Sequence, residues 1–333
     1  MGTPKVSVII DNYNYARYLP AAIDSVLAQT VKGRVEIIVV DDGSTDDSKK
    51  ILERYAGKVE AVFQANQGYA AAFNAGIARA KGAIVCLLDA DDVYEPEKIR
   101  RVVEAFEKHP DAPIVQHFLQ DTDAELRSLP QNFPKWPERA TIREYLEGKA
   151  EYAATSGLSF RRETLQKITP IPTELRFLYA DDYLTVRALL EGPGVNIPET
   201  LALHRVHGSN FCAGSYADAA KIAADFTMRR VYRDSIDRRL ESKGLSISPR
   251  FKRLEDLELF RREILFHMHE RRRLKAIGAW FGGIFRFALR GFGLFRVATC
   301  FLALISPSLY LRFYSSYARS KAIQGTRRRL RPS

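Results

Sequence analysis

The chain has 333 residues, 46% of them apolar and 27% charged, which indicates a globular protein with one large core and an appended part, or with two domains. Its net charge of +11 is uneven, because residues 251–333 hold 18 Lys and Arg against 5 Asp and Glu, which leaves −2 for residues 1–250. The three cysteines, Cys86, Cys212 and Cys300, argue against a disulfide framework or a zinc cluster and fit a reducing cytosol. No long apolar stretch follows Met1, so we expect no secretion signal.

Residues 5–120 alternate short β-branched runs with helical segments, a pattern typical of a mostly parallel sheet with helices on both faces. The predicted strands span 6–10, 35–40, 59–63, 84–88 and 114–118. The predicted helices between them span 18–29, 46–56, 69–80 and 96–108. The fold class is therefore α/β, with a Rossmann-like order of strands and helices.

The pattern changes after residue 120. Residues 121–150 carry three prolines around Trp136, and we expect an irregular connection that can cover a site. Further strands are predicted at 157–160 and 201–205, with a helix at 182–191 between them. The chain then reads as helical from 217 to 275.

Three carboxylates follow the apolar strand 84–88, in the sequence Asp89-Ala90-Asp91-Asp92. In an open α/β sheet ligands bind beyond the carboxyl ends of the strands. Carboxylate oxygens at such a place suit a hard cation such as Mg²⁺ or Mn²⁺, which in turn binds a diphosphate. The alternative is an acidic turn that caps the helix beginning near Glu95.

Two more strands end in polar loops. The first strand runs into Asp11-Asn12-Tyr13-Asn14-Tyr15, a loop suited to stacking and hydrogen bonding with a base. The second runs into Asp41-Asp42-Gly43-Ser44, where Gly43 permits a tight turn and Ser44 can cap the next helix. Capping does not explain Asp41 and Asp42, whose carboxylates can accept hydrogen bonds from a base or a ribose.

Together with Asn66-Gln67-Gly68 and Asn74-Ala75-Gly76, these loops resemble the nucleotide-binding half of family 2 glycosyltransferases over about residues 5–108. The resemblance implies a GT-A fold, a nucleoside diphosphate sugar as donor, and Mn²⁺ or Mg²⁺ as cofactor. It implies that Asp91, with Asp89, holds the metal. The nucleotide-binding residues that it implies are Asn12, Tyr13, Asn14, Asp41, Asp42, Asn66, Gly68, Asn74, Asp89 and Ala90.

The second half of the resemblance is looser. Tyr179-Ala180-Asp181-Asp182 stands where the family has Glu-Asp before a helix, which implies Asp182 as catalytic base, with Asp181 in place of the Glu. The alternative is a helix cap favoured by the helix dipole. The segment Arg205-Val206-His207-Gly208 is similar to one that lies beside the donor diphosphate, which implies contacts of Arg205 and His207 with phosphate, or of His207 with metal.

Other motifs are missing. Gln-x-x-Arg-Trp, the mark of processive synthases in this family, does not occur, so one sugar per encounter is expected. Neither a Gly-x-x-x-x-Gly-Lys phosphate loop nor Gly-x-Gly-x-x-Gly after the first strand is present, which disfavours P-loop enzymes and nicotinamide dehydrogenases.

Residues 271–333 form a basic, aromatic-rich tail with 14 Lys and Arg and no acidic residue. Its large apolar residues argue against a nucleic-acid partner. The longest uncharged run, 297–311, has 15 residues, whereas a membrane span needs about 20. We expect an amphipathic segment lying on an anionic membrane surface. Helices packed on the catalytic domain, or in an oligomer interface, are the alternative.

The sequence thus predicts a catalytic domain at 1–215, with a nucleotide half at 5–120 and an acceptor half at 121–215, followed by a helical extension at 216–270 and the tail. The expected reaction is inverting, metal-dependent transfer of a sugar to a hydroxyl of a glycan or lipid-linked acceptor, on the cytosolic face of the inner membrane, in envelope polysaccharide synthesis. A polyprenyl-phosphate sugar synthase and a non-catalytic nucleotide-binding scaffold are the alternatives.

Overall fold

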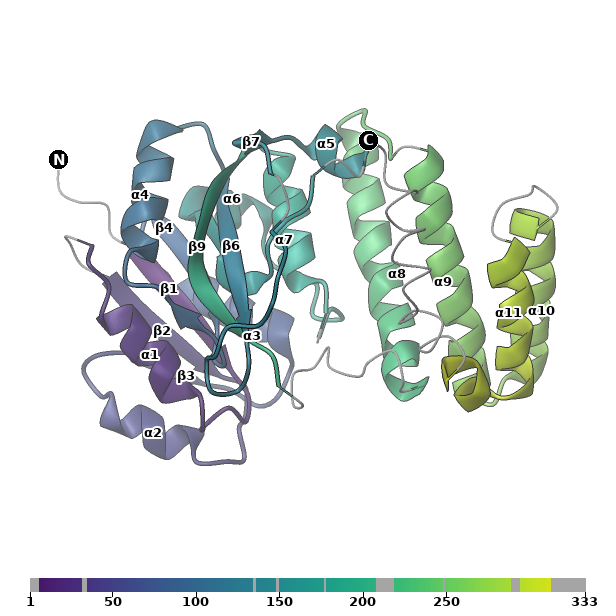
Figure 1. Cartoon of the computed structure of the whole chain (residues 1–333), viewed down its shortest axis with the longest axis horizontal. Coiled ribbons are helices and arrows are strands. Elements are labelled where there is room, and N and C mark those ends of the chain that lie inside the picture. Colours follow the sequence, from purple (N-terminus) through teal and green to yellow (C-terminus); the bar gives the residue numbers. More distant parts are fainter. Residues whose placement is uncertain are drawn as a thin grey trace. The chain divides into compact units, whose positions relative to one another are not determined.

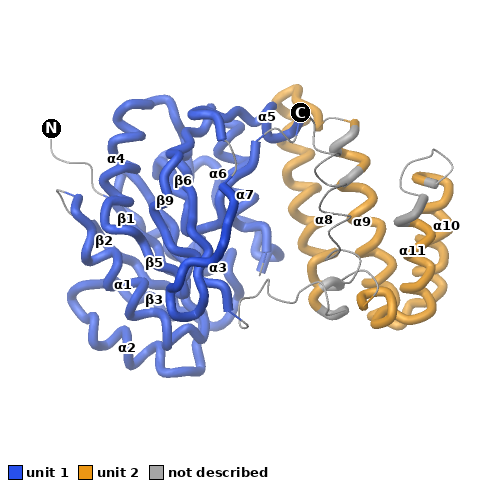
Figure 2. The backbone as a smooth tube through the Cα atoms, in the orientation of Figure 1, with its two compact units in different colours: residues 1–207 blue, residues 208–333 orange. Residues whose placement is uncertain are grey.

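The computed structural model describes residues 6–31, 35–133, 136–147, 150–176, 178–207, 219–247, 249–288 and 294–312. The chain divides into two compact units, residues 1–207 and residues 208–333 (Figure 2). The predicted boundary at 215/216 lies outside the described residues, and the one at 270/271 lies within the second unit. The predicted three-part division stays a prediction.

The first unit is built on one mixed sheet (Figure 1). Its strands follow the order β3-β2-β1-β4-β8-β6-β9-β5, with β7 paired to β9. Its strands are β1 (Val6–Asn12), β2 (Val35–Asp41), β3 (Glu60–Phe63), β4 (Ile84–Asp89), β5 (Val93–Tyr94), β6 (Ile114–Thr122), β7 (Arg139–Ala140), β8 (Leu158–Arg161) and β9 (Gly194–Arg205). The pairs β3–β2, β2–β1, β1–β4 and β6–β9 are parallel, whereas β8 runs antiparallel to both β4 and β6. The mostly parallel α/β sheet predicted from the sequence is confirmed.

Helices cover this sheet. They are α1 (Leu19–Leu27), α2 (Ser48–Arg54), α3 (Tyr69–Arg79), α4 (Lys98–Lys108), α5 (Ile142–Leu146), α6 (Arg162–Ile168) and α7 (Ala180–Leu189), with a 3₁₀ turn η1 at Thr155–Gly157. All of β4 before Asp89 is buried, as are six of the seven residues of β1. These central strands read as continuous apolar runs because both of their faces are covered.

One strand is longer than predicted. The sequence suggests a strand at 201–205, but β9 begins at Gly194. Its pairing with β6 shifts register where His117 lies opposite Ile197 and Phe118 lies opposite Thr200, so Pro198 and Glu199 form a bulge. Pro198 lacks a backbone N–H for the ladder and therefore hides the part of the strand that precedes it.

The described part of the second unit is helical. It consists of α8 (Ala219–Ser242), α9 (Pro249–His269), α10 (Arg273–Gly283), a π-helical turn (Ile284–Ala288) and α11 (Leu294–Ile305). Three ion pairs join α8 to α9: Arg229 with Glu255, Arg233 with Asp256, and Arg262 with Asp225. The helical stretch predicted at 217–275 is formed, in its described part, by α8, α9 and the start of α10, with breaks near Gly244 and Arg271, both of which have positive φ.

Candidate active site

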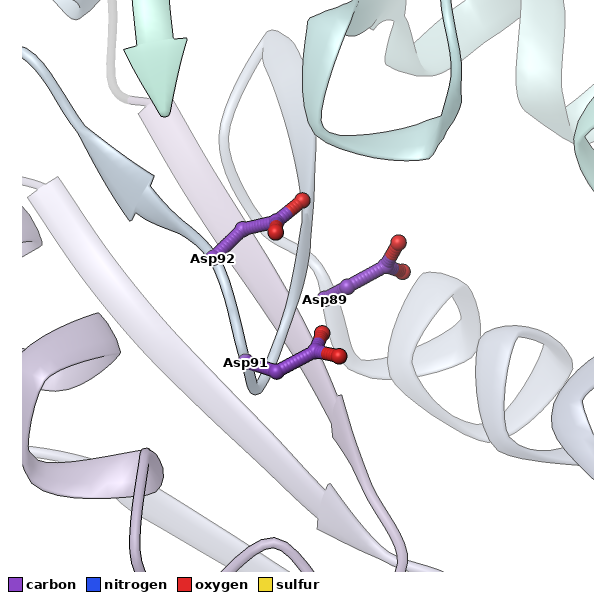
Figure 3. Close-up of side chains that lie close together, drawn as sticks. All are labelled: Asp89, Asp91 and Asp92. Atoms are coloured by element: carbon purple, nitrogen blue, oxygen red, sulfur yellow. The ribbon is translucent and has the colours of Figure 1, made fainter. Parts of the chain in front are cut away.

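Three carboxylates meet at the carboxyl end of β4. Asp89, Asp91 and Asp92 each offer an oxygen, and these oxygens lie within 4.8 Å of one another (Figure 3). Burial, together with the charges of Asp11 and Asp92, raises the pKa of Asp89 well above its usual range. Burial and the charge of Asp91 raise the pKa of Asp92 to about 7. Such a group is stable only with protons or with a cation.

A fourth carboxylate lies beside them. Asp11, at the end of β1, pairs with Asp89 in the parallel ladder between β1 and β4. Burial raises its pKa to about 7, and the charges of Asp91 and Asp92 add to the effect. One buried oxygen of Asp11 and one of Asp89 have no hydrogen-bond partner within the part of the chain that the structure describes. Unpartnered carboxylate oxygens at one place fit a hard cation such as Mg²⁺ or Mn²⁺.

The turn η1 holds the acidic cluster in shape. The Ser156 hydroxyl donates to Asp92 at 2.6 Å and accepts the backbone N–H of Asp89 at 3.1 Å. The backbone N–H of Arg205 donates to the other Asp92 oxygen at 2.8 Å. Asp92 is therefore fixed by protein donors, which leaves Asp89 and Asp91 as the predicted metal ligands.

His207 adjoins Asp91, and its contact with a metal stays a prediction. Its Nε2 lies 3.0 Å from Asp91 Oδ2, and its ring packs against the rings of Tyr15 and Tyr18, at centroid distances of 5.8 and 4.8 Å. The imidazole is largely buried and held in place, with one nitrogen turned to the carboxylate.

Arg205 packs inside the protein. Its guanidinium donates to the backbone carbonyls of Asp91 and Ala124 and lies over the ring of Tyr18, 4.6 Å from the ring centroid. Only 4% of the residue is exposed. These contacts position the loop that carries Asp91, and a contact of Arg205 with a diphosphate stays a prediction.

The two loops predicted to bind the nucleotide are tied together. Asn12 donates to Asp41 at 2.7 Å and to Ser44 at 3.1 Å, and Asp41 accepts the Ser44 N–H at 2.9 Å. Asn14, at a φ of 59°, accepts the Thr45 N–H at 2.7 Å. Tyr13 stays exposed beside them. Asn12, Asn14 and Asp41 thus shape this edge, and their contacts with a nucleotide stay predictions.

Asp42 organises the third loop. Its carboxylate accepts the N–H groups of Gln67 at 2.9 Å and Gly68 at 2.7 Å, and the Gln64 side chain at 2.7 Å. Gly68 has a φ of 92°, and a Cβ there would lie 2.5 Å from the carbonyl oxygen of Arg176, so only glycine fits. Asn66 follows Gln64 in the same loop.

Two other residues predicted to bind the nucleotide make hydrogen bonds with backbone groups. Asn74 exchanges two hydrogen bonds, each of 2.8 Å, with the backbone of Ile171. Ala90 is buried, and its N–H donates to the carbonyl oxygen of Asp11 at 3.2 Å. Contacts of Asn74 and Ala90 with a nucleotide stay predictions.

Asp181 and Asp182 stand in the first turn of α7. Asp181 accepts the Asp182 N–H at 2.9 Å and a long 3.5 Å bond from the Thr155 hydroxyl, next to Ser156 in η1. Its charge contributes to the raised pKa of Asp89, and burial raises the pKa of Asp181 itself. The turn η1 therefore links Asp181 to the acidic cluster, while Asp182 lies one residue further along the helix, half-buried.

Sequence reasoning placed Asp11 in a loop suited to contact a base, not in the acidic cluster, and it missed Thr155 and Ser156. Asp11 could have been found, because it directly follows a strand that neighbours β4 in a parallel sheet. The two hydroxyl residues gave no signal, since they reach the site through the antiparallel insertion of β8 between β4 and β6.

Known proteins resemble the chain in sequence and in fold. The family model described as "Glycosyl transferase family 2" matches residues 7–169. An uncharacterized glycosyltransferase of Nostoc sp. is 43% identical over 214 residues, which are 62% of this chain and 66% of that protein. An uncharacterized glycosyltransferase of Rickettsia prowazekii is 44% identical over 106 residues, 32% of this chain and 33% of that protein. The chain thus spans less than two thirds of the length of these relatives.

Two solved structures share the fold at low identity. Residues 1–349 of TarS from S. aureus, in complex with UDP, match with a TM-score of 0.54 and 18% identity, over 85% of this chain and 91% of that one. The mannosyltransferase PcManGT from Pyrobaculum calidifontis, in complex with GDP-Man and Mn²⁺, matches with a TM-score of 0.52 and 19% identity, over 92% and 85%. The fold is that of the GT-A glycosyltransferases, and the match over residues 7–169 places this part of the chain in glycosyltransferase family 2.

Proposed function

We propose that the chain transfers a sugar from a nucleoside diphosphate sugar to a hydroxyl group of a glycan or lipid-linked acceptor, with inversion at the anomeric carbon and one sugar per encounter. The observation that carries the proposal is the acidic cluster at the ends of β1 and β4, to which η1 links Asp181. One buried oxygen of Asp11 and one of Asp89 in this cluster have no hydrogen-bond partner among the described residues. The neighbours in complex with UDP and with GDP-Man and Mn²⁺ support a nucleotide sugar as donor.

Asp91, Asp89 and His207 are the residues that would hold Mn²⁺ or Mg²⁺. A cation bound by them would supply the positive charge that a departing diphosphate requires. The loops shaped by Asn12, Asp41 and Asp42 lie at the carboxyl ends of β1 and β2, where a base and ribose bind in folds of this kind.

Asp182 is proposed as the base. Its carboxylate would take the proton of the acceptor hydroxyl as that oxygen forms its bond to the anomeric carbon and the bond to the diphosphate breaks. Asp181, which adjoins the acidic cluster through Thr155, would position the first turn of α7. Both residues stand where the helix dipole favours the charged form of a carboxylate.

The site of action is proposed to be the cytosolic face of the inner membrane, within envelope polysaccharide synthesis. The basic and aromatic sequence after Glu270 supports this location. Within the described residues, no helix has both the length and the apolar character of a membrane span.

Thermal unfolding of the full chain with UDP, GDP and their sugar conjugates, each with and without Mn²⁺, tests the proposal. A ligand at 100 times its dissociation constant stabilises the folded state by about 2.7 kcal/mol. We expect the nucleotides of one of the two bases, uracil or guanine, to raise the unfolding temperature, and Mn²⁺ to enlarge this increase. The sugar conjugate of that nucleotide should then be hydrolysed slowly. If no nucleotide stabilises the protein and no donor is hydrolysed, a non-catalytic role holds instead.

A further inference from the structure

The helix α10 has two apolar faces. One face packs on α9, where buried Ala276 joins Phe260 and Ile264 in a shared core. The other face carries Leu274, Ile277 and Phe281 at helical spacing, and all three side chains are exposed. A helix at the surface of a globular protein usually buries one apolar stripe and turns polar residues outward. The second stripe of α10 therefore needs another explanation.

The apolar stripe continues onto α11 and the residues that flank both helices. Phe285 follows α10 with 67% of its surface exposed. Phe301 and Ile305 of α11 lie four residues apart and are exposed, as is Leu309, which follows the break in the helix at Ser306. Trp280 connects the two helices, because its ring lies 5.2 Å from the rings of both Phe281 and Phe301. We call this surface the outer apolar face, defined by Leu274, Ile277, Phe281, Phe285, Phe301, Ile305 and Leu309.

The charges around this face indicate what it contacts. Arg271, Arg272, Arg273 and Lys275 lie exposed beside Leu274, and Arg286 lies exposed beside Phe285. No acidic residue follows Glu270 in the sequence. Glu270, which pairs with Arg272, is the acidic residue at this border, so among the described residues the face is bordered mainly by cations. Apolar side chains with such a border match a surface that is apolar inside and negative at its boundary, which describes an anionic phospholipid bilayer.

We propose that the outer apolar face inserts its side chains into the headgroup and acyl boundary of an anionic bilayer, so that α10 and α11 lie on the membrane without crossing it. The inference rests on the proposed membrane location and names the residues that produce it. Both helices keep their packing on α9, because the buried face and the outer face of α10 are separate.

The test measures binding of the full chain to sedimented vesicles of phosphatidylcholine with 30% phosphatidylglycerol, and of phosphatidylcholine alone. Phe281→Ser combined with Phe285→Ser should weaken binding to the anionic vesicles at least about tenfold, since each buried aromatic contributes strongly. The matched control is Phe63→Ser on β3, because Phe63 is 51% exposed and Phe281 is 52% exposed. The control should bind vesicles like the parent.

A second measurement reports insertion directly. The chain has two tryptophans, so Trp136→Phe leaves Trp280, beside Phe281 and Phe301, as the reporter. Acyl chains brominated near the headgroup should quench its fluorescence on anionic vesicles. Replacing Arg272, Arg273 and Lys275 by Gln should weaken binding by about fivefold per charge and reduce its dependence on salt.

Three outcomes would overturn the inference. The serine variants could bind like the parent, Trp280 could stay unquenched while the protein sediments with vesicles, or the parent could form a lipid-independent oligomer that Phe281→Ser dissolves. The last result would make the outer apolar face a contact between copies of the chain. Nucleotide-induced thermal shifts, measured without lipid, report separately on the proposed enzymatic function.

Discussion

Asp91 is the residue on which metal binding depends most directly. Asp91→Asn nearly keeps the shape of the side chain but removes a charged oxygen from the acidic cluster. We expect loss of the Mn²⁺-dependent part of nucleotide binding in calorimetric titration. The unfolding temperature of the metal-free protein should stay unchanged or rise, because the charge of Asp91 contributes to the raised pKa values of Asp11, Asp89 and Asp92.

The control for this variant is Asp111→Asn, an exposed carboxylate that pairs with Arg139 away from the cluster. It should bind nucleotide and Mn²⁺ like the parent. Unchanged Mn²⁺-dependent binding in Asp91→Asn would remove Asp91 from the metal site.

The adjacent aspartates of α7 can be separated by kinetics. Asp182→Asn keeps the start of the helix but cannot take a proton, so kcat should fall about 10²-fold or more while the donor KM stays near that of the parent. Asp181→Asn should lower kcat less and should mainly raise the donor KM, because Asp181 is linked to the acidic cluster through Thr155.

If Asp181→Asn lowers kcat more than Asp182→Asn does, Asp181 is the catalytic base. Nearly normal turnover in both variants would favour the phosphate acceptor of a polyprenyl-phosphate sugar synthase, which is already ionised and requires no base.

His117 makes folding depend on pH. Its ring is completely buried, its Nδ1 lies 2.9 Å from the carbonyl oxygen of Phe118, and burial, with Lys98 nearby, lowers its pKa to about 3. In the unfolded chain a histidine has a pKa of about 6.5, so the unfolded state alone gains this proton between pH 6.5 and 3. Stability is therefore complete above pH 6.5 and falls as the pH drops through that window.

Between pH 7.5 and 5 this residue should account for about 2 kcal/mol of lost unfolding free energy. Denaturant unfolding at the two pH values measures the loss. His117→Leu should reduce it, whereas His269→Gln, at the exposed end of α9, should not. An equal loss in His117→Leu and the parent would assign the pH dependence to other groups.

At the scale of elements, η1 is the part of the site that the sequence did not reveal. Apolar periodicity predicts the strands around the site, and the acidic residues at the ends of β1, β2 and β4 predict where a ligand binds. No local pattern shows that β8 inserts antiparallel between β4 and β6, since that pairing depends on contacts between distant residues. The hydroxyls of Thr155 and Ser156 therefore reach the acidic cluster without a sequence signal.

Ser156→Ala tests the contribution of this turn. It removes the hydroxyl that donates to Asp92 and accepts the Asp89 N–H, in two hydrogen bonds that are buried or partly buried. Because a hydrogen bond to a charged group contributes about 1.5–3 kcal/mol, the unfolding free energy should fall by a similar amount, and Mn²⁺ affinity should fall with it. Ser128→Ala, at an exposed position, is the control. Unchanged Mn²⁺ affinity would limit η1 to a role in folding.

At the scale of the whole molecule, the sequence predicted the catalytic sheet better than the helical part. The alternation of strands and helices along the chain and the positions of the acidic loops follow from local patterns, and the structure confirms the α/β fold. The helical part shows why composition alone does not define a boundary between the helical extension and the tail. Leu257, Phe260, Ile264 and Leu265 of α9 share a core with residues of α10 and α11, although charge and aromatic content change at residue 271.

The two compact units have separate cores, so they should respond separately to ligand. We expect calorimetry of the full chain to resolve two unfolding transitions, because residues 1–207 and residues 208–333 each bury their own apolar residues. Nucleoside diphosphate with Mn²⁺ should raise the temperature of only one transition, that of the unit which holds the acidic cluster. At 100 times its dissociation constant, the ligand should increase the unfolding free energy of that unit by about 2.7 kcal/mol. Asp91→Asn should abolish the Mn²⁺-dependent part of that shift and leave the other transition in place. A single transition that moves as a whole would show instead that the units unfold together, and that the helical unit contributes to nucleotide binding through the stability of the catalytic one.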